Sequence, residues 1–546
     1  MIASDVLLIA ALLGFVVVWW VKASAKRDAA LLILAIATIG IAAVAAYMDR
    51  WQALVGLAVG VVFLAALLAR KFWRGARRDR PPYLSGSLLI LIAVVASLAP
   101  IMFPVPALPR PSGQHPVGVR SFELVDRSRV GVLNAAKDQP RRLLVRVWYP
   151  AANTEGIEAR PYFDTAEAKT TARSMGQLFA FEPFITYMRH GRTNSFEKAP
   201  LLTGAADLPT VIYSHGYTAF LSQNTALMED LASHGYVVYS VQHTGDSSAT
   251  VFPNGEVVPM DPALIKMMAE SPQARGEFPE AMLKGYTSSS FDDRLAGQLQ
   301  QAREQIERGD RLVTSAPAWV ADRLFVHDQL QQQAVPAEVA DIVAASALAR
   351  VGEIGMSFGG STTGAVCLRD VRCAAGVNLD GGDLHFAAFA ADMPQPFLMF
   401  HADPRVFYQQ LGVAANGTER SFNDFSYERF ETAGRRADLY RMQVKDAAHL
   451  GFSDFSLFMR TPLRTPIMGS TPADVMIGAQ NDGVRGFFDK HLRGIDNDFP
   501  AGVYEKYRGW VTSYDNSAVR EWWLSKSPQE RAALEQEIAA VKAKLP

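Results

Sequence analysis

The sequence predicts a doubly wound α/β domain with a mostly parallel sheet, preceded by a bundle of four transmembrane helices. Long apolar runs fill the first hundred positions, and beyond them short β-rich runs alternate with helical stretches. The chain has 546 residues, which is enough for two or three structural units. It carries 54 Lys and Arg against 55 Asp and Glu, and this balance argues against nucleic acid as a partner.

Four apolar segments account for the predicted membrane domain, which covers residues 1–105. Each segment approaches the ~20 residues that a helix needs to cross a bilayer, and none has a charged residue at its centre. The first is a poor signal peptide, because MIASD places no basic residue before it. We therefore expect an anchor in the membrane lipid bilayer, built from residues 6–21, 29–47, 51–69 and 88–105.

A GxxxG pattern in the third segment is formed by Gly56 and Gly60. Such a pattern lets two helices approach closely, so it leaves open a homo-oligomer that forms through the membrane helices. Glycine is also common in membrane helices, and we favour this simpler interpretation. No apolar segment contains the buried Asp, Glu, His or Lys that would mark a transport path.

A proline-rich linker at residues 106–116 leads into the α/β domain, which we expect over residues 117–505. Continuous apolar runs in this region are typical of parallel strands that are covered on both faces. The predicted strands are residues 142–149, 210–214, 236–241, 351–356, 374–379, 396–401 and 439–444. The predicted helices between them are residues 224–233, 361–368 and 475–492.

Two long segments interrupt this alternation, at about residues 153–206 and 252–336. Insertions of this length commonly shape a cap or a pocket wall, but extra helices packed on the sheet edge fit the pattern too. Residues 506–546 are predicted to form a helical tail. Its last part, residues 528–546, is rich in Glu and Lys and is expected to be a short amphipathic helix on the solvated surface.

The strongest chemical signal is the pentapeptide from Gly355 to Gly359, with Ser357 at its centre. It matches the pattern G-x-S-x-G, in which a serine nucleophile occupies a sharp turn between a strand and a helix. Glycines flank such a serine because Cβ atoms there would clash in the strained turn. An apolar strand precedes the pentapeptide and a helix of small residues follows it. The sequence therefore predicts an α/β-hydrolase fold with helical insertions.

A serine nucleophile needs an adjacent base and an acid that orients the base. In this fold the chain order is serine, acid, histidine. His449 lies in a loop after the predicted strand 439–444, where the base should be. Asp380 and Asp403 both end predicted strands, where this fold keeps its site, and spacing alone does not choose between them.

Two backbone N–H groups should hold the oxyanion of the reaction. One belongs to Phe358, directly after the nucleophile, and the other lies in residues 215–217, after the strand 210–214. We expect His215 to have a structural role beside this loop. His243, at another strand end, is treated as a pocket or structural residue.

Residues 115–493 resemble the platelet-activating-factor acetylhydrolases of the plasma and type II intracellular kind. The motifs that carry the resemblance are TVIYSHGYTAF, LASHGYVVYSVQHTGDSSA, IGMSFGGSTT, VNLDGG and HLGFSDFSLF. The resemblance implies Asp380 as the acid, with Asp403 as the second candidate, and Tyr217 as the second oxyanion donor. The family has no four-helix membrane domain at its start, so this part of the chain departs from it.

The motifs and the resemblance together predict a membrane-anchored serine esterase. Its leading substrates are phospholipids with short or oxidised acyl chains. A general carboxylesterase or polyester hydrolase, acting on small esters, is the alternative enzyme. A non-catalytic membrane binding module is the alternative of another class, disfavoured because all three triad candidates are present. No cofactor is expected, because no metal cluster of credible spacing, P-loop or GxGxxG motif occurs in the sequence.

Cys367 and Cys373 are the two cysteines of the chain. We expect them to be buried free thiols, which is the usual state of isolated cysteines. A disulfide between them is the alternative in an oxidising compartment, but the sequence makes its geometry doubtful.

The loops between the apolar segments predict the sidedness of the chain. Short cytoplasmic loops carry an excess of Lys and Arg, so the first and third loops should be cytoplasmic. Four crossings then place the esterase domain outside, on the periplasmic face of a bacterial inner membrane. The second loop has Arg50 as its basic residue, whereas the other two carry Lys22, Lys26, Arg27, Arg70, Lys71, Arg74, Arg77, Arg78 and Arg80.

Protease added to cells with a permeabilised outer membrane and a sealed inner membrane should therefore digest the region after Pro116. The reason is that this region is expected outside the inner membrane, within reach of the protease. If it is digested only after the inner membrane is breached, the esterase domain is cytoplasmic and the predicted sidedness is wrong.

Overall fold

The contacts of the chain separate it into two units whose membership does not follow the order of the sequence. The computed structural model describes residues 2–72, 83–131, 139–271, 276–386 and 388–545. The first unit comprises Met1–Ala107, Pro161–Arg192 and Leu457–Leu463, and the second comprises the remainder. The first unit thus takes two segments that we expected in the α/β domain. Four residues that the sidedness prediction counts lie outside the described residues, namely Arg74, Arg77, Arg78 and Arg80.

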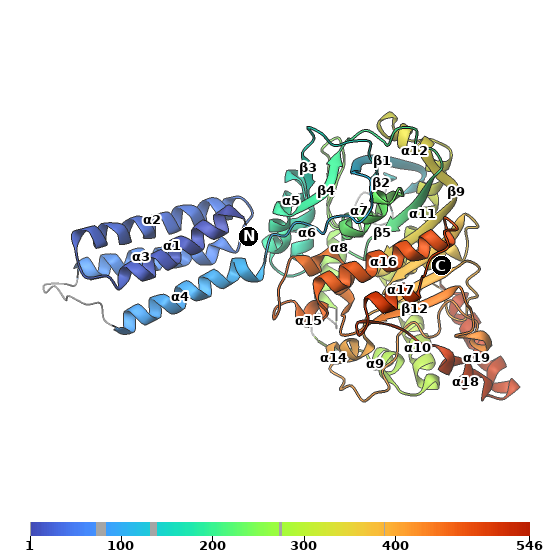
Figure 1. Ribbon diagram of the computed structural model, residues 1–546. Coiled ribbons are helices and arrows are strands. Elements are labelled where there is room, and N and C mark those ends of the chain that lie inside the picture. The colour runs from blue at the N-terminus through green and yellow to red at the C-terminus, as the bar shows by residue number, and fades with distance from the viewer. Residues whose placement is uncertain (1, 73–82, 132–138, 272–275, 387, 546) are drawn as a thin grey trace. The chain divides into compact units, whose positions relative to one another are not determined.

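The apolar segments near the N-terminus form four helices within the described residues, as the sequence predicts (Figure 1). Three of them are long and apolar enough to cross a membrane, whereas the first has 17 residues and is shorter. Large apolar side chains such as Val17 and Ile33 are 66% exposed, which is typical of a surface that meets lipid. The helices are α1 (Ala3–Trp19), α2 (Ala25–Tyr47), α3 (Ala53–Phe72) and α4 (Tyr83–Met102).

The glycine pair of the GxxxG pattern is used inside this bundle. A Cβ atom at Gly56 would collide with the side chain of Leu8 in α1. A Cβ atom at Gly60 would collide with Ile39 in α2. The small residues therefore let helices of the same chain approach closely. The pattern accordingly lends no support to a homo-oligomer, which stays a prediction.

A buried ion pair joins the ends of the apolar N-terminal helices. Asp5 lies in the first turn of α1 and Arg50 in the loop between α2 and α3, and both are almost completely buried. Nε and Nη2 of Arg50 donate to the two carboxylate oxygens of Asp5 over 2.9 and 3.0 Å. Nη2 also donates to the carbonyl of Pro100 in α4 over 3.2 Å. Because neither charge is solvated, removing one side chain would leave the charge of the other buried without a partner.

The first expected insertion contributes to this unit. Nε1 of Trp51, in the loop after α2, donates to the carbonyl of Phe184 over 3.0 Å, and the ring of Phe181 meets Trp51 edge-on. Asp49 of the same loop pairs with Arg189 over 2.8 Å. The segment therefore packs on the α2–α3 loop and forms α5 (Thr165–Lys169), α6 (Thr171–Gln177) and the 3₁₀ helix η1 (Glu182–His190).

The second unit is built on a mixed sheet that has 11 strands within the described residues, in the order β13-β12-β11-β10-β9-β5-β6-β2-β1-β4-β3. Its central strands, from β6 through β5, β9, β10 and β11 to β12, are mutually parallel, as the apolar runs predict. The strands before the nucleophile turn are β1 (Val117–Val130), β2 (Pro140–Pro150), β3 (Ala159–Pro161), β4 (Arg192–Glu197), β5 (Leu208–Ser214), β6 (Val237–Gln242) and β9 (Ser346–Met356). After it come β10 (Cys373–Leu379), β11 (Phe397–His401), β12 (Leu439–Val444) and β13 (Val511–Ser513), and a separate pair is formed by β7 (Thr250–Val251) and β8 (Val257–Val258).

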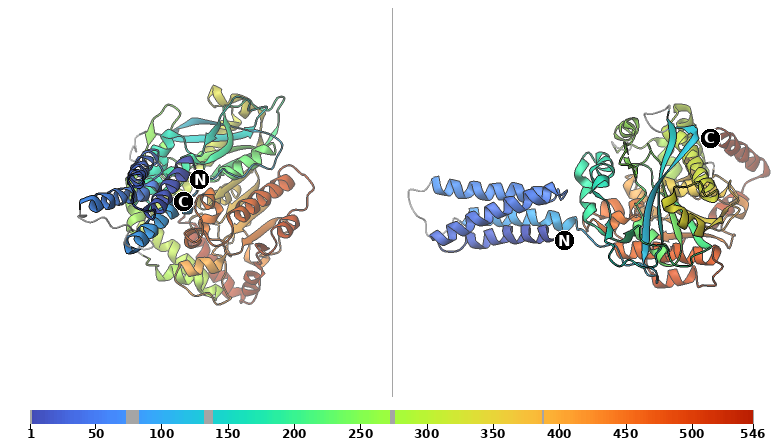
Figure 2. Two further views of the ribbon diagram at one scale, coloured as in Figure 1. Left: turned by 60° about the vertical axis from the view of Figure 1, so that its left-hand side comes forward. Right: turned by 90° about the horizontal axis from the view of Figure 1, so that it is seen from above.

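Helices cover both faces of this sheet (Figure 2). Val211 and Tyr213 of β5 belong to one apolar cluster with α7 and α16, whereas Ile212 between them belongs to another with α11 and α12. This is the three-layer arrangement of an α/β-hydrolase-like fold, as predicted. The helices are α7 (Thr225–Ser233), α8 (Pro262–Glu270), α9 (Glu280–Thr287), α10 (Phe291–Arg308), α11 (Arg311–Gln331), α12 (Ala340–Ala345), α13 (Phe358–Cys367), α14 (Pro404–Gln410), α15 (Thr465–Met468), α16 (Ala473–His491), α17 (Ala501–Lys506), α18 (Ser517–Leu524) and α19 (Pro528–Lys542). Short 3₁₀ helices are η3 (Ala337–Val339), η4 (Asp383–His385), η5 (Phe430–Thr432), η6 (His449–Phe452) and η7 (Asp454–Leu457).

The C-terminal segment forms the helical tail that the sequence predicts, and it also makes contacts with the second unit. Strand β13 extends the sheet by pairing antiparallel with β12. Helix α19 buries Ile538 and Val541 in a cluster with Leu295 and Leu299 of α10. Most other side chains of α19 are exposed, as expected of a surface helix.

Cys367 and Cys373 form a disulfide, which corrects the expectation of free thiols. Cys367 ends α13 and Cys373 begins β10, and the tight connection between these elements brings their Cα atoms to 5.1 Å. This separation lies within the usual range for a bridge. The spacing of two cysteines in the sequence does not reveal such a turn.

Replacing Arg50 with Met should destabilise the first unit by about 3–5 kcal/mol, because the carboxylate of Asp5 would stay buried without its partner. Thermal unfolding of the purified full-length protein in detergent micelles measures the loss. The double variant Asp5→Leu/Arg50→Met should recover most of it, since an apolar pair leaves no buried charge. Equal stability of the wild type and Arg50→Met would show that the ion pair does not hold the bundle.

Candidate active site

Ser357 occupies the turn between the carboxyl end of the central strand β9 and α13. Its φ of 57° and ψ of −126° lie in a region that residues with a side chain rarely adopt. A Cβ atom at Gly355 would collide with the main chain of Gly359, and one at Gly359 with the carbonyl of Ser214. The two glycines therefore permit a turn that no other residues would allow without movement of the main chain.

A continuous hydrogen-bonded chain runs from Ser357 through His449 to Asp380. Nε2 of His449 lies 2.8 Å from the hydroxyl of Ser357, and its Nδ1 lies 2.8 Å from Oδ2 of Asp380. Because an ionised carboxylate only accepts, Nδ1 carries the proton and Nε2 accepts from the serine hydroxyl. The N–H of Ala402 donates to the other oxygen of Asp380 over 2.7 Å and fixes the carboxylate. This arrangement can take a proton from Ser357.

Asp403, the second candidate acid, is engaged elsewhere. It caps the N-terminus of α14, where its Oδ1 accepts from the N–H of Arg405 over 3.0 Å, and its Oδ2 accepts from the N–H of Asp446 over 2.8 Å. The guanidinium of Arg405 also pairs with it. Burial raises the pKa of Asp403, but these hydrogen bonds outweigh burial and hold the pKa below its usual value. The geometry therefore favours Asp380 over Asp403.

Both expected oxyanion donors lie close to Ser357. A Cβ atom at Gly216 would lie 3.3 Å from Cβ of Ser357, so the loop that contains Tyr217 borders the nucleophile. Within the described residues, the N–H groups of Phe358 and Tyr217 have no protein acceptor. Both rings belong to one apolar cluster with Trp319 of α11. The N–H groups are thus available to a ligand.

A cavity of about 310 Å³ lies beside this chain, and Asp380 and His449 form part of its wall. Three rings give it an aromatic side, because the centroids of Tyr286, Phe407 and Phe422 lie 5.4 to 6.0 Å from one another. Tyr286 belongs to α9, so the second expected insertion supplies a pocket wall. The remaining lining residues are Met282, Gly382, Ala402, Pro404, Gln410, Arg420, Ser421 and Ala448.

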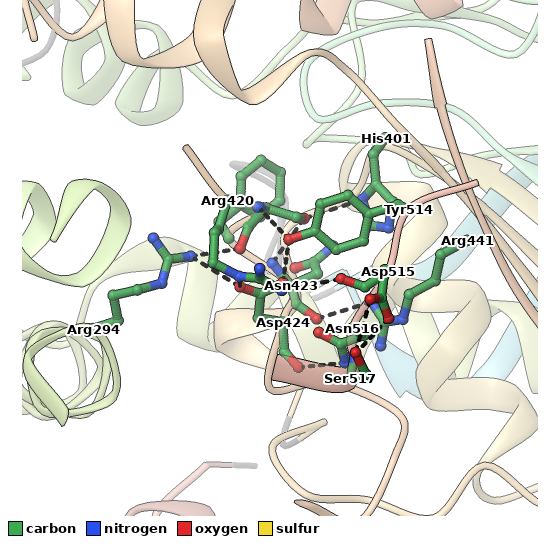
Figure 3. A network of polar contacts seen from close by, with 12 residues as sticks. Arg294, His401, Arg420, Asn423, Asp424, Arg441, Tyr514, Asp515, Asn516 and Ser517 are labelled. Atoms are coloured by element: carbon green, nitrogen blue, oxygen red, sulfur yellow. Dashed lines mark hydrogen bonds and ion pairs between the residues drawn. The ribbon is translucent and has the colours of Figure 1, made fainter. Parts of the chain in front are cut away.

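The loop that contributes Ser421 and Phe422 to this cavity is held by buried charged side chains (Figure 3). Nη2 of Arg294 donates to the carbonyl of Ser421 over 2.6 Å, and Nη1 of Arg441 donates to that of Asn423 over 3.2 Å. The amide of Asn423 in turn donates to the carbonyl of Gly381, which follows the acid, over 2.5 Å. The pocket wall and the acid are therefore braced by the same network.

Several residues around the site have no signal in the sequence. Tyr286, Phe407 and Phe422 carry no motif, because separate loops bring them together. Asp322, which binds the buried His243, also belongs to no motif. The sequence shows only that a charged residue interrupts a mostly apolar stretch of α11. Among the described residues, no group of three or more His, Cys, Asp or Glu side chains is arranged to hold a metal ion.

Comparison with known proteins supports an ester hydrolase. Residues 101–268 match the family model described as platelet-activating factor acetylhydrolase, isoform II. The chain is 23% identical over 348 residues to a platelet-activating factor acetylhydrolase of Cavia porcellus, covering 62% of this chain and 68% of the relative. It is 23% identical over 444 residues to a "probable 1-alkyl-2-acetylglycerophosphocholine esterase" of Arthroderma benhamiae, covering 76% and 94%. The resemblance that the motifs indicate is thus confirmed.

A solved structure shares the fold of this chain. It is a ferulic acid esterase from Streptomyces cinnamoneus, which matches with a TM-score of 0.51 at 20% sequence identity. The match covers 76% of this chain and 100% of that chain. At this identity the likeness shows the fold alone, and it agrees with the α/β-hydrolase-like layers of the second unit.

Asp380→Asn should lower kcat far more than Asp403→Asn. The amide keeps the shape of the side chain but removes the charge that stabilises the imidazolium, and the cost in a comparable triad is ~10⁴-fold. Hydrolysis of a short p-nitrophenyl ester by the purified full-length protein measures both variants. A larger loss in Asp403→Asn would assign the acid to the later strand.

Proposed function

We propose that this chain is a membrane-anchored serine esterase that hydrolyses carboxylic ester bonds. The observation that carries the proposal is the hydrogen-bonded chain from Ser357 through His449 to Asp380. Two unpaired main-chain N–H groups beside Ser357 add what an acyl transfer needs to stabilise its oxyanion. The similarity to acetylhydrolases supports the same class of reaction.

In the proposed first step, His449 takes the proton of Ser357 as the serine oxygen attacks the ester carbonyl. The carbonyl oxygen becomes an oxyanion, which accepts hydrogen bonds from the N–H groups of Phe358 and Tyr217. Asp380 keeps the imidazole in the productive tautomer and stabilises its positive charge. The imidazolium then protonates the leaving alkoxide, and the alcohol departs from an acyl-serine.

In the second step, water replaces the alcohol. His449 takes a proton from the water as it attacks the acyl carbonyl, and the same two N–H groups hold the second oxyanion. Collapse of this intermediate breaks the bond to Ser357, whose oxygen regains its proton from the imidazolium. This step releases a carboxylic acid and regenerates the free serine, so the whole reaction consumes only the ester and one water.

Helices α2, α3 and α4 support the membrane anchor, because each is long and apolar enough to cross a bilayer. The basic first and third loops favour a periplasmic location for the esterase unit in a bacterial inner membrane. In this arrangement the bilayer is both the anchor of the enzyme and a store of lipid substrate.

The cavity beside the triad favours esters with a compact group. Its volume of about 310 Å³ is near the lower end for ligand pockets, which commonly run from about 300 to 1,000 Å³. Acetylated glycerophosphocholine appears in the name of one relative. We therefore propose phospholipids with short or oxidised acyl chains as the leading substrates.

Two other functions remain as alternatives. A general carboxylesterase or polyester hydrolase would use the same three residues on other esters, and it differs in the group that the aromatic cavity accepts. A non-catalytic membrane binding module would not need the intact chain of Ser357, His449 and Asp380. Because all three are present and joined by hydrogen bonds, we favour the enzyme.

Ser357→Ala should abolish ester hydrolysis, with a loss on the order of 10³-fold or more, because the members of a triad act as a unit. Labelling of the full-length protein by a fluorophosphonate should be lost in parallel. The matched control is Ser346→Ala, which removes a hydroxyl at the opposite end of β9. Near-normal turnover of Ser357→Ala would end the serine-esterase proposal.

Phe422→Ala should shift the substrate preference toward longer acyl chains, because it removes one ring from the cavity wall. We expect the kcat/KM ratio of an octanoyl to an acetyl ester to rise about tenfold or more, as one methylene is worth 10- to 200-fold in a fitted pocket. Phe425→Ala is the control, since Phe425 is in the same loop but packs in a separate apolar cluster. Phe425→Ala should change stability without changing this ratio. If the octanoyl-to-acetyl ratio is the same in the two variants, the cavity does not bind the acyl chain.

A further inference from the structure

The peptide between Gly216 and Tyr217 is held from behind by a buried imidazole. Nδ1 of His215 donates to the carbonyl of Gly216 over 2.7 Å. This carbonyl shares a rigid plane with the N–H of Tyr217, and in a trans peptide the two groups point in opposite directions. The hydrogen bond on one side of the plane therefore sets the direction of the N–H on the other.

The N–H groups on either side of this peptide are already occupied. That of Gly216 donates to Oε1 of Gln223 over 2.8 Å, and that of Thr218 donates to the carbonyl of Asp246 over 2.9 Å. No acceptor among the described residues meets the N–H of Tyr217. The loop is thus anchored on both sides, with one donor left for a ligand beside the nucleophile.

A second histidine determines which nitrogen of His215 carries the proton. The main-chain N–H of His243 donates to Nε2 of His215 over 3.2 Å, so Nε2 accepts and Nδ1 is protonated. Burial, with a contribution from His243, lowers the pKa of His215 to about 3, so its ring stays neutral at neutral pH. The ring can therefore always donate from Nδ1 to the carbonyl of Gly216.

His243 is itself held by a buried polar chain. Its Nδ1 lies 2.9 Å from Oδ2 of Asp322, and its Nε2 lies 2.9 Å from the hydroxyl of Ser214. Its ring stacks on Trp319 with centroids 3.8 Å apart, and Arg141 pairs with Asp322 over 2.6 Å. These side chains repeat the residue types of a serine triad but are fully buried, so substrate cannot reach them. Their geometry suits support rather than turnover.

We propose that His215 is a positioning residue for ester hydrolysis, which aims the N–H of Tyr217 at the developing oxyanion through the carbonyl of Gly216. His243 and Asp322 keep its ring in place. The inference rests on the proposed serine-esterase function. A preorganised donor stabilises the oxyanion without reorganisation during the reaction. Because the oxyanion exists only after the attack, His215 contributes to kcat rather than to substrate binding.

Two replacements of His215 separate this hydrogen bond from packing. In His215→Asn the side-chain amide can occupy the position of Nδ1 and still donate to Gly216. In His215→Gln the amide lies further from the main chain, near the position of Nε2. Loss of a whole oxyanion donor costs ~10²–10³-fold in kcat. We therefore expect His215→Gln to lower kcat by about 10- to 100-fold with little change in KM, and His215→Asn to retain most of it.

The experiment uses the full-length protein in detergent micelles, with p-nitrophenyl acetate as substrate. The rate of fluorophosphonate labelling at Ser357 is a second readout, because phosphonylation also develops charge on an oxygen in the oxyanion site. The matched control is His327→Gln. His327 is equally buried, and its Nε2 donates to the carbonyl of Leu348 near the start of β9 over 2.8 Å. The control should lower Tm but leave kcat and the labelling rate unchanged.

The positioning role is overturned if His215→Gln keeps the wild-type kcat, or if both His215 variants lose kcat equally. A rise in KM alone would assign His215 to substrate binding and would also overturn it. A wild-type protein that neither hydrolyses the ester nor is labelled at Ser357 would overturn the proposed function itself. Labelling of the wild type therefore distinguishes the two failures.

Discussion

The left-handed backbone of Ser357 is the constraint on which the rest of the site depends. Such a conformation persists only where the surroundings hold it from several sides. Here the main chain packs so closely that Gly355 and Gly359 have no room for a side chain. The turn lies at the carboxyl end of β9. The parallel strands β10 and β12 have their carboxyl ends on the same side of the sheet. Their ends carry Asp380 and, after a short loop, His449, so the strand order itself assembles the hydrogen-bonded chain.

In a strand, the main-chain N–H and C=O groups form hydrogen bonds with neighbouring strands. Loops at the end of a sheet lack these partners, so their main-chain groups need other hydrogen-bond partners. In this protein buried side chains provide them. His215 holds the oxyanion loop, Arg294 holds the pocket wall, and Asn423 holds the turn after the acid. The first unit follows the same rule, because Arg50 joins Asp5 to the end of α4. Each of these polar side chains is buried away from water, so it is stable only where its hydrogen-bond partner is in place. The loops that carry the partners are therefore held in one conformation.

The two insertions of the α/β domain have different destinations, which no pattern in the sequence distinguishes. Residues 161–192 belong to the unit of the apolar N-terminal helices and pack on the loop that carries Trp51. The second insertion divides its roles, since Tyr286 of α9 lines the cavity while Leu295 and Leu299 of α10 pack with the C-terminal helix. The pocket-wall alternative therefore applies to α9, whereas α10 packs against the C-terminal helix α19, which neither alternative anticipated.

The sequence by itself determined the apolar N-terminal helices, the parallel core strands and the position of the serine turn. Each of these is a local pattern, set by a run of apolar residues or by glycines at fixed spacing around Ser357. Only the tertiary structure decided that His449 meets Asp380 rather than Asp403, that Cys367 and Cys373 are bridged, and which rings line the cavity. These features depend on contacts between residues far apart in the chain. Hydropathy and spacing report which face of an element is buried, but not which partner covers it.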